Sequence, residues 1–134
     1  MPDARTMNET ETVTKISGRS VSDTVARLTE LVGAKRMRLF AVIDQAAEAR
    51  KVGLQLRETT MVIFGSPVAG TPVMVAAPLA ALDLPLKVLV WADGQQTKVS
   101  YDSPAVIARR RGLSPELAAS LAGINDLTDA LVSP

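Results

Sequence analysis

Apolar residues recur every three or four positions from Ser20 to Val32, and this spacing predicts an amphipathic helix. The stripe consists of Val21, Val25, Leu28 and Val32. Ser20 is a suitable N-cap with Asp23 three positions later, and Gly33 is a suitable stop. The helix therefore has one face for a core and one for solvent.

Alternation with a period of two predicts strands elsewhere. The expected strands cover residues 11–17, 37–43, 59–64, 84–91 and 98–101, and Leu54 and Leu56 also have strand character. Asp93-Gly94 is a strong turn signal, so the last two strands are expected to form a hairpin.

Capping signals predict the remaining helices. Asp44 precedes a short helix over 46–52, and Thr71-Pro72 is expected to cap a helix that continues to residue 82. Ser103-Pro104 and Ser114-Pro115 have the same pattern, the second before one long helix over 115–131. The element order predicts an α+β fold, a two-layer α/β sandwich with a mixed, mostly antiparallel sheet and helices packed on one face. We expect a disordered tail over 1–10 and a single domain over 11–134.

Composition narrows the possible functions. The 134-residue chain is 47% hydrophobic and carries a net charge of +1, so no nucleic-acid partner is expected. It has no cysteine and no histidine, which excludes thiol nucleophiles, disulfides and histidine-based triads or zinc sites. We expect no metal and no cofactor. No apolar leader or bilayer-length run is present in the sequence, so we expect a cytoplasmic protein with no membrane partner.

The stretch FGSPVAGTPVM, residues 64–74, raises the question of a phosphate-binding loop. Gly65 and Gly70 have the P-loop spacing, but Thr71 stands where lysine is required, and Pro72 removes a backbone donor. This argues against a nucleotide triphosphatase. Amide groups near Pro72, with the Ser66 and Thr71 hydroxyls, could still hold a small anion. The alternative is that this stretch forms only a tight turn and a cap.

Three acidic residues are candidates for chemistry. Asp44 and Glu48 are one helical turn apart and could converge as paired carboxylates, or could respectively cap a helix and pair with a basic side chain. Asp83 lies among leucines and is either a turn-former held by backbone amides or a carboxylate of altered pKa.

Two further features have plain structural explanations. The run 109–111, three arginines before Gly112, is expected to be a solvated helix end rather than a site for an acidic partner. Trp91 and Tyr101 could face each other across the hairpin, in packing, in a dimer contact or at a ligand.

An ordered set of motifs covers residues 40–104. These are F-x-x-I-D (40–44), A-x-x-x-G (49–53), FG-x-P (64–67), G-T-P (70–72), A-L-D-L-P-L (81–86) and Y-x-x-P (101–104). With them the chain resembles domain-of-unknown-function family 302, over roughly residues 11–112. The resemblance implies a compact two-layer α/β domain and a homodimer. Members of that family commonly have histidine where this chain has Gln45, and many have asparagine where it has Ser66.

The leading hypothesis is a homodimeric cytoplasmic domain that binds a small ligand, either an anion or an apolar acid. The candidate ligand-binding residues are Asp44, Gln45, Glu48, Gly65, Ser66, Gly70, Thr71 and Asp83. One alternative is an enzyme that uses Asp or Glu carboxylates in acid–base chemistry, which requires these groups to line one pocket. Another is a purely structural interaction module, with an apolar interface in the region 73–86.

Overall fold

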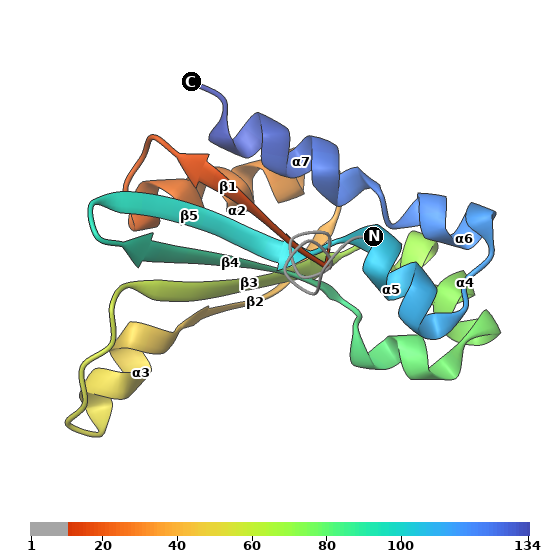
Figure 1. Cartoon of the computed structure of the whole chain (residues 1–134), viewed down its shortest axis with the longest axis horizontal. Helices are drawn as coiled ribbons and strands as arrows, with labels where there is room; N and C mark the ends of the chain where they lie inside the picture. The colour runs from red at the N-terminus through yellow and green to blue at the C-terminus, as the bar shows by residue number, and fades with distance from the viewer. Residues whose placement is uncertain (1–10) are drawn as a thin grey trace, which may run out of the picture.

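The computed structural model describes residues 11–134, and the predicted tail over 1–10 lies outside the described residues. Its centre is a five-stranded sheet in which every neighbouring pair is antiparallel, in the order β1-β5-β4-β3-β2 (Figure 1). The strands are β1 (Thr12–Ser17), β2 (Arg38–Asp44), β3 (Thr59–Gly65), β4 (Leu86–Asp93) and β5 (Gln96–Asp102). The predicted α+β class is confirmed.

The β4–β5 hairpin turns where the sequence predicted it. Asp93 pairs with Gln96, which leaves a two-residue loop, and Gly94 has a φ of 61° that favours glycine. The segment containing Leu54 and Leu56 is not a strand; both side chains are exposed in the connection that leads into β3.

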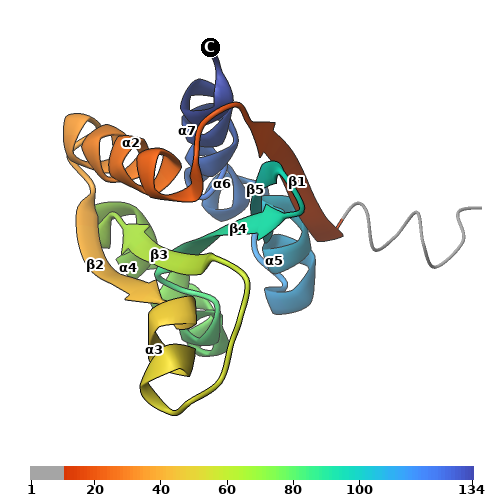
Figure 2. The ribbon, with the colours of Figure 1, turned by 90° about the vertical axis from the view of Figure 1, so that its left-hand side faces the viewer.

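The helices occupy one face and both ends of the sheet. They are α2 (Val21–Ala34), α3 (Gln45–Lys51), α4 (Pro67–Ala76), the 3-10 helix η1 (Pro78–Leu82), α5 (Pro104–Arg111), α6 (Pro115–Ser120) and α7 (Gly123–Val132). Helices α2 and α7 cover one face, α3 projects from one end, and α4 to α6 gather at the other (Figures 1 and 2). The predicted helix is confirmed as α2, with the Ser20 hydroxyl accepting from the Asp23 amide at 3.0 Å. The predicted stop at Gly33 was wrong, because Gly33 lies inside α2, which continues to Ala34, and the residue with a positive φ after the helix is Arg36.

The main core lies between the sheet and the α2/α7 layer. Leu28 and Leu127 from the helices and Val62, Phe64 and Val90 from the sheet are completely buried there. A second, smaller cluster lies among the helices at the end of the sheet and comprises Val73, Ala80, Ile107 and Leu121. Apolar periodicity thus supplies two cores, one on the sheet and one beyond it.

The prediction of one helix over 115–131 was wrong. The chain breaks between α6 and α7, around Leu121 and Ala122. Leu121 packs into the small cluster at the sheet end, whereas Ile124 and Leu127 pack on the sheet. Because these surfaces lie in different directions, one straight helix cannot bury all three side chains.

Candidate functional site

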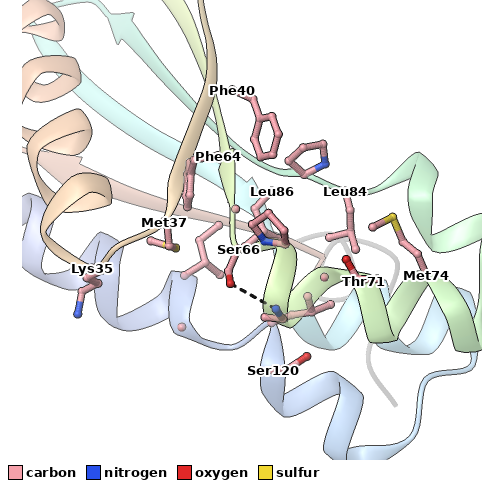
Figure 3. A pocket seen from close by; sticks show the side chains of 18 of the residues that line it. Lys35, Met37, Phe40, Phe64, Ser66, Thr71, Met74, Leu84, Leu86 and Ser120 are labelled. Carbon is pink, nitrogen blue, oxygen red and sulfur yellow. Dashed lines mark hydrogen bonds between the residues drawn. The ribbon is translucent and has the colours of Figure 1, made fainter.

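A pocket of about 500 Å³ opens between the end of the sheet and helix α4 (Figure 3). Gly65 and Ser66, where β3 ends, form part of one wall, and Gly70 and Thr71 on α4 continue it. Another wall comes from the α2–β2 connection and the start of β2, and a third from the junction of α6 and α7. Four of the eight predicted ligand-binding residues therefore line one cavity.

The cavity is lined mainly by apolar side chains with a few polar groups. The larger apolar residues are Met37, Phe40, Phe64, Met74, Leu84 and Leu86. The polar side chains are those of Lys35, Ser66, Thr71, Ser120 and Asp126. An apolar cavity of this size with few polar groups has the usual character of a small-molecule site.

Helix α4 begins at Pro67, five residues before the predicted start. Ser66 is the N-cap, its hydroxyl accepts from the Ala69 amide at 3.3 Å, and Pro67 occupies the first turn. The prediction that Thr71 caps the helix was wrong, because Thr71-Pro72 lies inside α4. Ser66-Pro67 carries the same cap-then-proline signature and directly follows a buried strand.

This placement removes the support for a phosphate loop. The amides of Ala69 and Gly70 donate to the Ser66 carbonyl at 3.1 and 2.8 Å, and Pro67 has no amide hydrogen. Few donors remain at the start of α4 for an anion. The structure therefore favours the turn-and-cap explanation of the two glycines, which here also leave space for the cavity.

Asp44 and Glu48 lie away from this pocket. The register of β2 on β3 pairs Arg38 with Gly65 and Asp44 with Thr60. Five residues of strand correspond to about 17 Å, so Asp44 and Gln45 are at the opposite end of β2. Within one chain, the predicted site is divided between the two ends of the sheet.

Local interactions account for these two carboxylates. Asp44 Oδ1 accepts from the Ala47 amide at 2.9 Å and caps α3. Glu48 Oε2 lies 2.7 Å from Lys51 Nζ on the exposed surface of α3, and the hydrogen bond and charge of Glu48 raise the pKa of Lys51. The two side chains therefore act separately, as a cap and as half of a surface ion pair.

Asp83 is held by two arginines, which the sequence did not predict. Its two oxygens accept from Arg110 Nη1 at 2.6 Å and Arg111 Nε at 2.7 Å. Arg109 forms an ion pair with Glu11, with 3.8 Å between Nη2 and Oε1. Gly112 ends α5 with a φ of 64°, as expected, but the arginine run ties α5 to the residue after η1 instead of being a fully solvated end. Asp83 therefore lies in a turn, as expected, but its side chain is held by arginine side chains and not by backbone amides.

Trp91 and Tyr101 do not face each other. Trp91 lies opposite Lys98, and its indole Nε1 donates to the Ser100 hydroxyl at 3.0 Å. Tyr101 belongs to the main core, and its hydroxyl donates to Asn125 Oδ1 at 2.7 Å. Successive residues along a strand point to alternate faces, so Trp91, which shares a face with its partner Lys98, lies on the opposite face of the sheet from Tyr101.

Several pocket residues were missed by sequence reasoning. Lys35 and Met37 come from the α2–β2 connection, Phe40 is the extra residue of a β-bulge, and Asp126 is in the first turn of α7. Phe40 was assigned to a strand, but nothing in its neighbours indicated a bulge that lines a cavity. Within residues 11–134 there is no cluster of three or more acidic side chains suited to a metal ion.

With the fold and pocket described, sequence comparison defines the family. The profile of the family described as "Domain of unknown function DUF302" matches residues 13–131. The chain belongs to this family. The biochemical activity of the domain is uncharacterised.

Curated relatives from Brucella resemble most of the chain. "Fluoride-specific ion channel FluC 1" of Brucella suis biovar 1 (strain 1330) is 36% identical over 109 residues, which are 79% of this chain and 43% of the relative. The protein of the same name from Brucella abortus biovar 1 (strain 9-941) is 36% identical over 40% of its length. The chain thus spans about two fifths of these relatives. Among residues 11–134, no helix combines the length and apolarity needed to cross a bilayer.

A solved structure has the same fold. It is the crystal structure of an uncharacterized conserved protein, DUF302, from Bacillus stearothermophilus, with a TM-score of 0.77 and 18% identity. The alignment covers 90% of this chain and 94% of that one. This likeness establishes the fold and does not identify a ligand.

Proposed function

We propose that this DUF302 domain binds a small carboxylic acid with an apolar body in the pocket beside α4. The observation that supports the proposal is the cavity of about 500 Å³, whose walls are largely apolar with a few polar groups among them. A ligand with an apolar body and one acidic head matches that distribution. We further propose, from the family resemblance, that the domain acts as a homodimer in the cytoplasm.

Two side chains are suited to the acidic head. The Ser66 oxygen accepts the Ala69 amide, so its own O–H remains to donate to a carboxylate. Lys35 lines the same pocket and carries the positive charge. Because Lys35 is exposed, its ion pair with a ligand contributes little, and burial of the apolar body supplies most of the affinity.

A series of linear carboxylates tests this directly. Each buried methylene contributes about 0.8 kcal/mol, so the Kd should fall about fourfold per added methylene from butanoate to octanoate. Isothermal titration calorimetry measures the Kd, and protein-detected NMR shows whether the shifts map to the pocket. An affinity independent of chain length, or shifts confined to other surfaces, would contradict the proposal.

A variant that fills the pocket tests where the ligand binds, and a surface variant of the same helix is its matched control. A Cβ at Gly70 would lie 3.8 Å from Leu84 Cδ1, so a side chain fits there and extends into the lined space. Gly70→Leu should abolish octanoate binding while the fold is retained. Ala76→Leu adds the same side chain at an exposed position of α4 outside the pocket and should leave binding unchanged.

The name of the Brucella relatives raises fluoride as another candidate ligand. We propose the apolar acid over fluoride because apolar walls cannot replace the hydration of a small anion. A titration with sodium fluoride followed by ¹⁹F NMR separates the two. Fluoride binding without octanoate binding would replace the proposed ligand.

The other hypotheses receive unequal support. An enzyme with paired carboxylates is disfavoured, because Asp44, Glu48 and Asp83 have separate local partners. An interaction module is favoured by four exposed apolar side chains on α4 and η1, those of Val68, Val75, Leu79 and Leu82. Three of them lie in the region 73–86 where we expected an interface. Alanine substitutions at these four positions should leave octanoate affinity unchanged, which separates the two roles.

A further inference from the structure

Two serine hydroxyls that line the pocket differ in what they offer a ligand. Ser66 Oγ accepts the Ala69 amide at 3.3 Å, so its own O–H is left to donate. Ser120 Oγ donates its proton to the Leu117 carbonyl at 2.6 Å, so only its lone pairs are left, and these accept. A carboxylate can accept from Ser66 but has no hydrogen to give to Ser120. The pocket therefore has a place for a donor group beside the acid.

The charged side chains of the pocket, Lys35 and Asp126, repeat this division. Helices α2 and α7 pack side by side and run antiparallel (Figure 1), and Arg19, just before α2, donates to the Leu131 carbonyl near the end of α7 at 3.1 Å. Lys35, directly after α2, and Asp126, in the first turn of α7, are therefore at the same end of this helix pair. Among residues 11–134, no side chain forms an ion pair with either of them.

Donors and acceptors come from different walls of the cavity. Ser120 and Asp126 belong to the junction of α6 and α7, whereas Ser66 directly follows β3 and Lys35 lies in the α2–β2 connection. In Figure 3, Lys35, Ser66 and Ser120 lie towards the lower side of the view, and Phe40 lies above them. A polar head placed between these walls meets donors on one side and acceptors on the other, with apolar side chains beyond it.

We infer that the ligand is an apolar α-amino acid, whose carboxylate binds at Ser66 and Lys35 and whose ammonium group binds at Ser120 and Asp126. This inference rests on the proposed function, a carboxylic acid with an apolar body, and adds a second charge to the head group. An ammonium group has three donors and no acceptor, which matches the two acceptors of the α6–α7 wall. An α-amino acid carries both charges at one end, so its side chain can enter the apolar part of the pocket.

Norleucine and hexanoate test the second charge, because they differ only in the α-ammonium group. Norleucine should bind about tenfold more tightly than hexanoate, since hydrogen bonds from a charged donor are among the stronger ones. Pentylamine, which lacks the carboxylate, should bind more weakly than norleucine. Isothermal titration calorimetry at pH 7 measures all three values of Kd.

The outcomes separate this inference from the proposed function. Norleucine binding no tighter than hexanoate, while both bind in the pocket, would overturn the amino-acid inference and leave the proposed function intact. If neither compound binds, or if NMR shifts for both map outside the pocket, the proposed function fails as well.

Removal of the accepting hydroxyl tests the ammonium site. Ser120→Ala should weaken norleucine binding about fivefold and leave hexanoate binding unchanged, because only the ammonium group donates there. Ser133→Ala is the matched control, since Ser133 Oγ makes the same type of bond, to the Ala130 carbonyl at 2.9 Å, outside the pocket. The control should alter neither affinity. Equal weakening of both ligands by Ser120→Ala, or no weakening of norleucine, would overturn the assignment.

Neutralisation of the acidic side chain tests the charge. Asp126 is exposed, so Asp126→Asn should weaken norleucine binding only about threefold, and less at high salt. Hexanoate should not bind more weakly to this variant, because its carboxylate is repelled by Asp126. Asp23→Asn, at an exposed position in the first turn of α2 and outside the pocket, is the matched control and should leave both affinities unchanged. Weaker hexanoate binding to Asp126→Asn, or unchanged norleucine binding, would show that Asp126 does not receive the ammonium group.

Discussion

The sheet face under α2 and α7 and the sheet end beside α4 use similar apolar residues but are packed differently. On the covered face, Leu28, Phe64 and Leu127 are completely buried and fill the space between layers. At the end, the residues that line the gap along β3 and α4 include Gly65, Ser66, Ala69 and Gly70, all with small side chains. Small residues leave the cavity open, since protein interiors otherwise close to crystal-like density.

The difference shows where a cavity can be maintained in this fold. The covered face is spanned by regular helices whose long side chains interdigitate with the strands. The sheet end is enclosed by short helices and a 3-10 turn that face in several directions. Stability should therefore depend mainly on the first region, and ligand binding on the second.

Truncation of one leucine in each region should produce the largest contrast. Leu127→Ala should reduce the free energy of unfolding by about 2–5 kcal/mol, because the side chain is completely buried. Leu84→Ala, at the partly exposed cavity wall, should cost about 1 kcal/mol. Urea unfolding measures both, and octanoate affinity should fall only for Leu84→Ala. Equal costs would contradict the division between a stabilising core and a binding end.

Removal of one carboxylate charge should lower the free energy of unfolding by less than a core truncation does. The loss should again differ between the end of the sheet beside α4 and the end that bears α3. Asp83→Asn weakens the two-arginine contact that joins α5 to the sheet end, with an expected cost of about 1–2 kcal/mol. Glu48→Gln, in the exposed pair with Lys51, should change stability by less than about 0.5 kcal/mol. Chemical denaturation measures both variants. A larger loss for Glu48→Gln would show that the end bearing α3 is the more tightly coupled one.

The smallest expected effect is the pH dependence of stability that Asp93 contributes at the β4–β5 hairpin. A hydrogen bond from Lys98 at 2.6 Å, with its charge and that of Arg57, lowers the pKa of Asp93 below 3.8. Because the folded pKa is the lower one, this contribution is present above about pH 4 and is lost as pH falls through the folded value. Asp93→Asn should therefore lower the Tm slightly at pH 7, and the difference should shrink towards pH 3.

A second background controls this measurement. In a Lys98→Met chain, Asp93→Asn should no longer alter the pH dependence of the Tm, because the main partner is absent. Octanoate affinity should stay constant in all of these variants, since Asp93 does not line the pocket. A change in affinity would couple the hairpin to the binding end and break the separation of regions.

The sequence predicted the helices and strands that have strong local signals, but it did not predict which distant residues come together in the fold. The stripe of α2 and the Asp93-Gly94 turn are local patterns, and both were correct. The predicted start of α4 was wrong because Ser66-Pro67 and Thr71-Pro72 carry the same cap-then-proline signature. The helix begins at the first of them, which directly follows the end of the buried strand β3. Half of the predicted ligand-binding residues line the pocket, because one contiguous stretch contributes them.

The remaining pocket residues come from segments far apart in the chain. Lys35 and Asp126 meet at one cavity only after α7 packs against the sheet beside α2. The roles of Asp83 and the arginines were hidden for the same reason, since 27 residues separate Asp83 from Arg110. A pair of this kind leaves no periodic trace in the sequence.

By itself, the sequence determined the family, the α+β class and the chemistry that the chain cannot perform. Those conclusions depend on residue types and short spacings, which any conformation of the chain retains. The tertiary structure decided that small residues at the end of β3 and on α4 enclose a cavity, and that Asp44 and Gln45 lie at the other end of the same strand. Distances of this kind depend on strand register and on the direction in which each helix packs, and these are properties of the folded chain as a whole.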